Sequence, residues 1–118
     1  MEYNPFDNPM VKVTSQSVYN AAKKILGENL DRVYLYGSYA RGDYDEESDI
    51  DYMVIANLPQ KEACAQLMPL SRDTNELDLE YNIVVSTNIT SREIFNRFCI
   101  ASNFFRNILV EGIEIIGH

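Results

Sequence analysis

The stretch that decides the fold runs from residue 37 to residue 51 and reads Gly37-Ser38-Tyr39-Ala40-Arg41-Gly42-Asp43-Tyr44-Asp45-Glu46-Glu47-Ser48-Asp49-Ile50-Asp51. A Gly-Ser turn follows the apolar run 33–36, and two aspartates separated by one apolar residue open a second apolar run. This order predicts a strand, a turn that can hold phosphate, and a second strand whose first residues can hold a metal ion.

Asp49 and Asp51 stand two residues apart where the second strand is expected to begin. Residues two apart on a strand point to the same face and lie about 6–7 Å apart along it. Two neighbouring carboxylates repel each other, whereas Mg²⁺ binds carboxylate oxygens together with the phosphate oxygens of a substrate. The pair therefore predicts a magnesium site.

Gly37 and Ser38 form the predicted phosphate-binding half of the motif. Glycine can adopt a positive φ and lets the backbone approach a ligand, while the Ser38 hydroxyl and the following amides can donate to phosphate oxygens. The spacing from Gly37 to Gly42 also matches the glycines of a P-loop. Asp43 and Tyr44, however, stand where that motif needs Lys and then Ser or Thr. A P-loop is therefore excluded.

The combination of G-S-x-A-R-G with S-D-I-D resembles the signature of the minimal nucleotidyltransferases in the DNA polymerase β-like superfamily. The order of the other expected elements is similar to that family across most of the chain. The resemblance implies an α/β (α+β) fold with a small mixed β-sheet flanked by helices. It also implies that Gly37 and Ser38 hold the phosphates of a nucleotide, that Asp49 and Asp51 bind Mg²⁺, and that Arg41 has a structural or phosphate-facing role.

The family also uses a third acidic residue on a neighbouring strand. The alternating stretch 77–86 is the strand expected here, and its polar face carries Asp78, Glu80 and Asn82. Glu80 is favoured as the third catalytic and metal-binding acid because it lies deeper in the expected strand, and Asp78 is the alternative. If neither acid reaches the metals, the chain is expected to bind nucleotide without turning it over.

Size and charge limit the other possibilities. The 118 residues, 46% of them apolar, are expected to form a single domain over 1–118. The net charge of −8 disfavours direct binding to nucleic acid, because no cationic patch compensates the phosphates. No apolar run could span a bilayer and no secretory signal is evident, so a cytoplasmic location is expected. Cys64 and Cys99 are expected to be reduced core residues, and the terminal His118 leaves little for zinc or triad chemistry.

Capping and periodicity signals predict the remaining elements. A first helix is expected from a Ser15 or Ser17 cap to Leu26, with Gly27 ending it. A later helix is expected to break near Pro69. The other expected elements are strands over 32–36, 50–56 and 78–86, a helix beginning after a Thr90 or Ser91 cap, and a helix spanning 103–111.

The last forty residues are rich in large apolar side chains. Two interpretations are open: these side chains pack on the open face of the sheet, or part of them forms a surface that binds another protein. The residues concerned are Phe95, Phe98, Ile100, Phe104, Phe105, Ile108, Leu109 and Val110.

The function implied by the resemblance is Mg²⁺-dependent transfer of a nucleoside monophosphate to a hydroxyl, with ATP as the expected donor. Minimal members of the family resemble the antitoxin half (MntA type) of toxin–antitoxin modules whose partner is a small helical HEPN protein, and some add AMP to that partner. Two alternatives stay open. One is a non-catalytic nucleotidyltransferase-fold module that acts by contact, and the other is an aminoglycoside-type nucleotidyltransferase.

Overall fold

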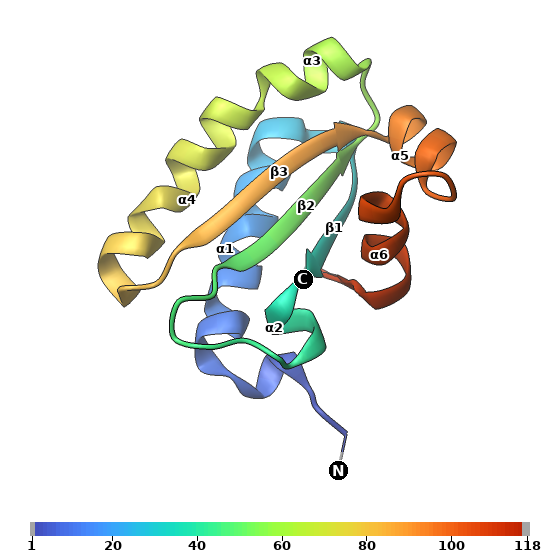
Figure 1. Cartoon of the computed structure of the whole chain (residues 1–118). Helices are drawn as coiled ribbons and strands as arrows, with labels where there is room; N and C mark the ends of the chain where they lie inside the picture. The colour runs from blue at the N-terminus through green and yellow to red at the C-terminus, as the bar shows by residue number, and fades with distance from the viewer. Residues whose placement is uncertain (1, 117–118) are drawn as a thin grey trace.

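A four-stranded mixed sheet forms the centre of the computed structural model, which describes residues 2–116 except for the side chains of residues 76–81. The strand order is β3-β2-β1-β4, with β2 antiparallel to β1 and parallel to β3, and β4 antiparallel to β1. The strands are β1 (Leu30–Tyr36), β2 (Ile50–Ala56), β3 (Val85–Ser91) and β4 (Ile113–Glu114). The expected mixed sheet flanked by helices is confirmed (Figure 1).

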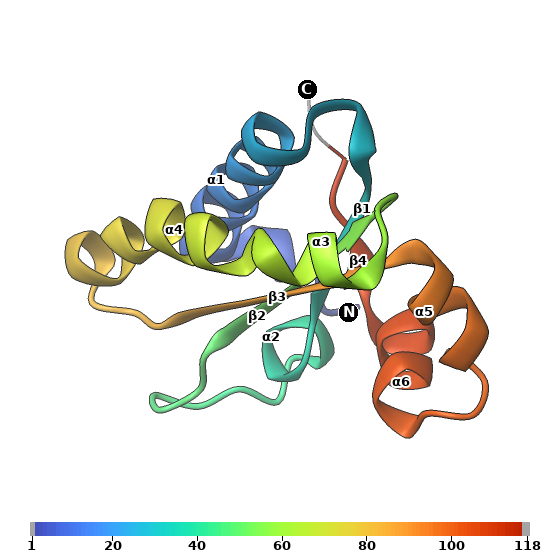
Figure 2. The ribbon, with the colours of Figure 1, turned by 90° about the horizontal axis from the view of Figure 1, so that it is seen from above.

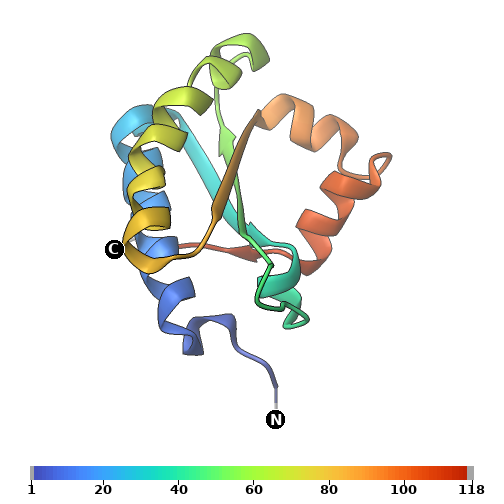
Figure 3. The same cartoon turned by 60° about the vertical axis from the view of Figure 1, so that its left-hand side comes forward.

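Helices cover both faces of this sheet (Figures 2 and 3). One face carries α1, α3 and α4, and the other carries α5 and α6, while the short α2 lies at the end of the sheet where β1 finishes. The helices are α1 (Pro9–Leu26), α2 (Ser38–Arg41), α3 (Gln60–Ala65), α4 (Leu67–Tyr81), α5 (Arg92–Phe98) and α6 (Asn103–Glu111), with two 3₁₀ turns at Pro5–Asp7 and Gly27–Asn29.

Strand β2 is the core of the molecule because it is buried on both faces, as its unbroken apolar run predicts. Tyr52 and its alternate neighbours face α1, whereas Met53 and Ile55 face α5 and α6. The fully buried Tyr52 hydroxyl hydrogen-bonds to the hydroxyls of Thr14 at 2.7 Å and Ser15 at 2.8 Å. Asp51 is the one acidic residue of this strand and lies at its open end.

The start of the first helix differs from the sequence prediction, whereas its end agrees with it. Helix α1 begins at Pro9 rather than after Ser15 or Ser17, because the Asn8 side chain accepts a hydrogen bond from the Met10 amide and Pro9 occupies the first helical position. Ser15 and Ser17 both lie in the interior of α1. Gly27 ends α1 as predicted, with φ of 57°.

The third strand was placed wrongly by the sequence pattern. Helix α4 extends through Tyr81, and Asn82 in the left-handed conformation ends it, so β3 begins only at Val85. Pro69 does not end a helix, because the break between α3 and α4 falls earlier, at Gln66. Pro69 lies in the first turn of α4, where its missing amide proton removes no hydrogen bond of the helix.

The C-terminal aromatic residues serve partly as core. Phe95 and Ile108 are buried against the sheet, whereas Ile100 and Val110 are 80% and 74% exposed. Both cysteine thiols are free, as predicted, but neither is a buried core residue: Cys64 is exposed and Cys99 is half-buried at the edge of the core. Among the described residues, no helix is both long and apolar enough to cross a membrane.

Candidate functional site

Gly37 lies directly against the carboxylate of Asp51. Gly37 joins β1 to α2 with φ of 78° and ψ of −156°, a conformation that L-residues rarely adopt. A methyl group added at Gly37 would overlap Asp51 Oδ2. The close approach is possible because the end of β1 pairs with the start of β2, Tyr36 being opposite Asp51. The structure thus brings the Gly-Ser turn and the second aspartate together.

Asp51 and Asp49 interact through their charges. The pKa of Asp51 is raised to about 6, mainly by burial and to a lesser extent by the negative charge of Asp49. Asp49 is exposed just before β2, and Asp51 is half-buried at its second position. Because ionisation of Asp51 next to Asp49 is costly, the site is suited to a divalent cation, which would compensate both negative charges.

Arg41 is held at the C-terminal end of α2 by two carboxylates. Its guanidinium donates to Asp43 at 3.1 Å and to Glu111, at the end of α6, at 3.4 Å. The positive charge of Arg41 lowers the pKa of Asp51, although less than burial and Asp49 raise it. The exposed guanidinium therefore lies within electrostatic range of the aspartate pair and could also meet a phosphate.

The strand beside Asp51 carries neutral polar residues rather than a third acid. In the parallel β2–β3 pair, Asp51 is next to Ser86, and Asn88 follows on the same face. Asp78 and Glu80, the two predicted candidates, belong to the last turns of α4 and not to a strand beside Asp51. Their side chains lie outside the described part of the structure. The strand placement of both acids was therefore wrong.

Tyr36 is a site neighbour that the sequence interpretation missed. Its hydroxyl accepts a hydrogen bond from Asn88 Nδ2 at 3.3 Å, and its ring packs edge-on against Phe104 of α6, with the ring centroids 5.6 Å apart. Burial, and to a lesser extent the Asp51 charge, raise the pKa of Tyr36. The signal for Tyr36 was its position immediately before the Gly-Ser turn.

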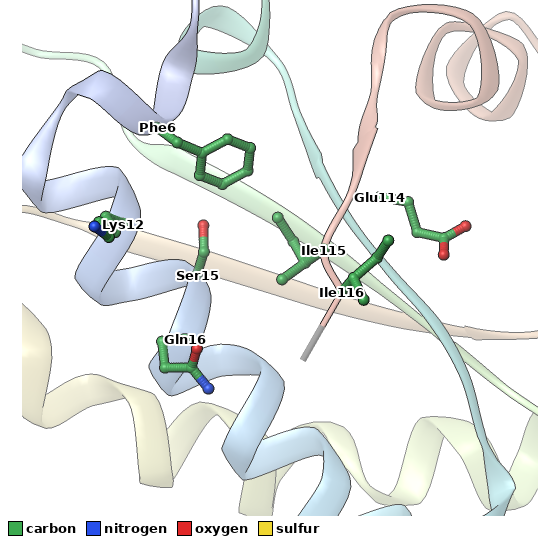
Figure 4. Close-up of a pocket in the computed structure, with 7 residues that line it drawn as sticks. All are labelled: Phe6, Lys12, Ser15, Gln16, Glu114, Ile115 and Ile116. Atoms are coloured by element: carbon green, nitrogen blue, oxygen red, sulfur yellow. The ribbon is translucent and has the colours of Figure 1, made fainter. Parts of the chain in front are cut away.

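Two cavities differ in their relation to the aspartates. One of about 410 Å³ is lined by Asp49 together with residues of α2 and of the segment before β3, including Tyr39 and Asn82. The other, of about 320 Å³, lies between α1 and the chain after β4, where Ser15 and Gln16 lie across from Ile115 (Figure 4). The first cavity includes one of the predicted site residues, Asp49, and the second includes none of them.

The donor set fits a hard divalent cation. Asp49 and Asp51 offer carboxylate oxygens, and the absence of a side chain at Gly37 lets the Asp51 carboxylate lie directly against the Gly-Ser turn. Among the described residues, no group of three Asp, Glu, His or Cys side chains is close enough to bind a metal ion. Mg²⁺ is usually bound by one or two carboxylates together with substrate phosphates, and Asp49 and Asp51 could supply those carboxylates.

Comparison with known proteins agrees with this geometry. The model of the nucleotidyltransferase domain family matches residues 19–112. A protein of Methanocaldococcus jannaschii named "Putative protein adenylyltransferase MJ0604" is 35% identical over 96 residues, which cover 79% of this chain and 85% of that protein.

Solved structures share the fold. A chain in the crystal structure of a mutant of the toxin-antitoxin MntA-HpeT superimposes with a TM-score of 0.53 at 16% identity, over 88% of this chain and 73% of that one. A chain in a toxin-antitoxin crystal structure with AMP-PNP gives a TM-score of 0.54 at 18% identity, with the same coverage. Since the family model covers most of the chain and the motif and the fold agree with it, the chain belongs to the nucleotidyltransferase domain family.

Proposed function

We propose that this protein transfers AMP from ATP to a hydroxyl group of a partner protein in a Mg²⁺-dependent reaction. The observation that carries the proposal is the contact between the Gly37 turn and the Asp51 carboxylate, with Asp49 close enough to raise the Asp51 pKa. A phosphate-binding turn placed against two carboxylates can bind a nucleoside triphosphate and a divalent cation together.

Each residue has a defined task in this reaction. Asp49 and Asp51 would hold the cation, which supplies positive charge to the triphosphate and to the departing pyrophosphate. The Ser38 hydroxyl and the backbone amides of Ser38 and Tyr39 would donate to phosphate oxygens, whereas the amides of Ala40 and Arg41 already donate to the Gly37 carbonyl oxygen. The acceptor hydroxyl gives its proton to solvent, its oxygen attacks the α-phosphorus, the bond from that phosphorus to the oxygen bridging it to the β-phosphate breaks, and pyrophosphate leaves. Arg41 would stabilise the charge that develops on the phosphates.

Three observations support a protein as the acceptor. The archaeal relative carries the name of a protein adenylyltransferase, and structures with the same fold come from toxin-antitoxin complexes. This chain also leaves Ile100 and Val110 largely exposed in and beside the α5–α6 pair, which borders the site through Phe104. A small helical protein of the HEPN type is the partner we propose.

A second candidate is a module that neutralises its partner by contact alone. Ser86 and Asn88 occupy the strand beside Asp51, so neither can act as a third carboxylate that deprotonates an acceptor. In that case the fold would bind nucleotide without transferring it.

Label transfer separates the two candidates. The purified protein is incubated with Mg²⁺ and ATP labelled on the α-phosphate in a lysate of the source cell. ATP labelled on the γ-phosphate serves as one control and the Asp49→Asn, Asp51→Asn double variant as another. A protein band labelled only from the α-phosphate, and only by the unmodified chain, supports AMP transfer to a protein.

The other outcomes are equally informative. Nucleotide binding without any transfer supports the contact-only module, and the double variant should then still neutralise the partner. Transfer to an added aminoglycoside, with no labelled protein, would instead support an antibiotic-modifying enzyme.

A further inference from the structure

Tyr36 stands in a row of side chains that crosses three strands on one face of the sheet. It is directly opposite Asp51 in the antiparallel pair of β1 and β2, and Asp51 is next to Ser86 in the parallel pair of β2 and β3. Directly opposed residues of an antiparallel pair have their Cβ atoms about 5 Å apart. Tyr36 is therefore a nearest neighbour of the aspartate that abuts the Gly37 turn.

The hydroxyl of Tyr36 accepts one hydrogen bond and has its own proton left to donate. Asn88 Nδ2 donates to it at 3.3 Å, so one lone pair of the oxygen is occupied while the hydroxyl keeps its own proton to donate. Within the described part of the chain, Asn88 is the one hydrogen-bond partner of this hydroxyl. The edge-on contact with Phe104 holds the ring in place.

The phosphate oxygens of a nucleotide bound at this site would accept hydrogen bonds from neutral donors such as the Tyr36 hydroxyl. Its phosphates would lie beside the Gly37 turn and the Asp49–Asp51 pair, and Tyr36 adjoins the turn in sequence and Asp51 in space. We propose that the Tyr36 hydroxyl, held by Asn88, donates a hydrogen bond to a phosphate oxygen of the bound nucleotide. This inference rests on the proposed function, because it presumes that a nucleoside triphosphate occupies the site.

The Tyr36→Phe variant tests the donor while keeping the ring against Phe104. Affinity for a non-hydrolysable ATP analogue is measured by calorimetry with saturating Mg²⁺. We expect affinity to fall about 10- to 100-fold, the usual effect of losing a hydrogen bond to a charged group. The Asn88→Ala variant should lose less. Combined with Tyr36→Phe, it should add little, because the two residues act through one hydroxyl.

Tyr34→Phe is the matched control. Tyr34 lies one pleat away on the same strand and face, and its hydroxyl accepts a hydrogen bond from Arg32 at 2.8 Å. This variant should keep the nucleotide affinity of the unmodified protein. Thermal unfolding of all variants shows whether a loss of affinity reflects unfolding instead.

Metal binding without nucleotide decides between two roles for the hydroxyl. Mn²⁺ affinity, read by electron paramagnetic resonance, should change less than about twofold in Tyr36→Phe, because a hydrogen bond to a phosphate is absent there. A parallel loss of Mn²⁺ affinity would mean that Tyr36 acts on Asp51 and would overturn the proposal, as would unchanged nucleotide affinity. If the unmodified protein binds no nucleotide at all, the proposed function fails first.

Discussion

At the scale of single residues, Gly37 is the position with the least freedom to change. Its φ of 78° is unfavourable for any other residue, and a methyl group there would overlap Asp51 Oδ2. We expect Gly37→Ala to abolish nucleotide binding, because the Asp51 carboxylate must move. The free energy of unfolding should fall by about 1–3 kcal/mol from backbone strain. Calorimetric titration and urea denaturation measure the two effects separately.

Gly27→Ala is the control for backbone strain. Gly27 also has a positive φ, of 57°, but a methyl group there would meet no atom within 4 Å. The two variants should lose similar stability, and only Gly37→Ala should lose nucleotide binding. Equal nucleotide affinity in the two variants would show that the contact between the turn and Asp51 is not needed.

The raised pKa of Asp51 makes a second prediction at this scale. Its pKa rises from 3.8 to about 6 on folding, so the ionised carboxylate destabilises the metal-free fold, and this cost grows as the pH rises through that interval. The full shift would correspond to about 3 kcal/mol, and solvent around the half-buried side chain reduces this to about 1–2 kcal/mol. Asp51→Asn should therefore unfold less readily than the unmodified protein at about pH 8.

The pH dependence is the critical part of that experiment. Near pH 4, about the ordinary pKa of aspartate, the stability difference between Asp51→Asn and the unmodified protein should largely disappear. Urea denaturation at the two pH values, in the presence of a chelator, gives both numbers. A stability difference that does not change with pH would mean that the two proteins differ by packing and not by the charge.

At the scale of elements, Asn82 marks the boundary that the sequence pattern missed. It ends α4 with φ of 52°, a conformation that Gly and Asn tolerate and β-branched residues do not. Asn82→Gly should leave the free energy of unfolding nearly unchanged, and Asn82→Val should lower it by about 1–2 kcal/mol. If the segment were instead a strand through residue 82, Val would be the better tolerated substitution.

The same segment shows how far the sequence could predict the elements. Strand β2 and helix α6 were predicted with the correct bounds. A continuous apolar run marks the whole of β2, and residues typical of helix ends mark both ends of α6. In the 77–81 stretch, Leu77, Leu79 and Tyr81 alternate like a strand, yet every residue is also tolerated in a helix. The choice depends on tertiary packing, since α4 lies against both α1 and β3. For this reason Asp78 and Glu80 were assigned to a strand, although they belong to α4.

The site, in contrast, could be predicted where one motif supplies it. Gly37 and Asp51 meet because a single connection joins β1 to β2, so their sequence spacing fixes the approach. Ser86 and Asn88 come from β3, which reaches Asp51 only after the long crossover through α3 and α4. The register of two strands joined by such a crossover is not encoded in local sequence. For this reason the neighbours of Asp51 on β3 became evident only in the structure.

At the scale of the whole molecule, the charge distribution opposes the proposed nucleotide. The chain carries a net charge of −8, and six acidic residues lie between residues 43 and 51, around the turn that is to hold phosphates. Arg41, the cation of this region, is already paired with Asp43 and Glu111. The fold as a whole therefore repels ATP unless a divalent cation is present.

This repulsion predicts an unusual dependence on salt. Raising the salt concentration from about 0.02 M to about 0.2 M shortens the screening length from about 20 Å to about 7 Å. In the presence of a chelator, the weak residual affinity for ATP should increase with salt, because like charges are then screened. Added Mg²⁺ should tighten binding by at least about tenfold, since it carries the charge that the protein lacks. Adenosine, without phosphates, is the control and should bind independently of salt. Residual ATP affinity that falls with salt would show that cationic side chains, and not the aspartate pair with its metal, dominate nucleotide binding.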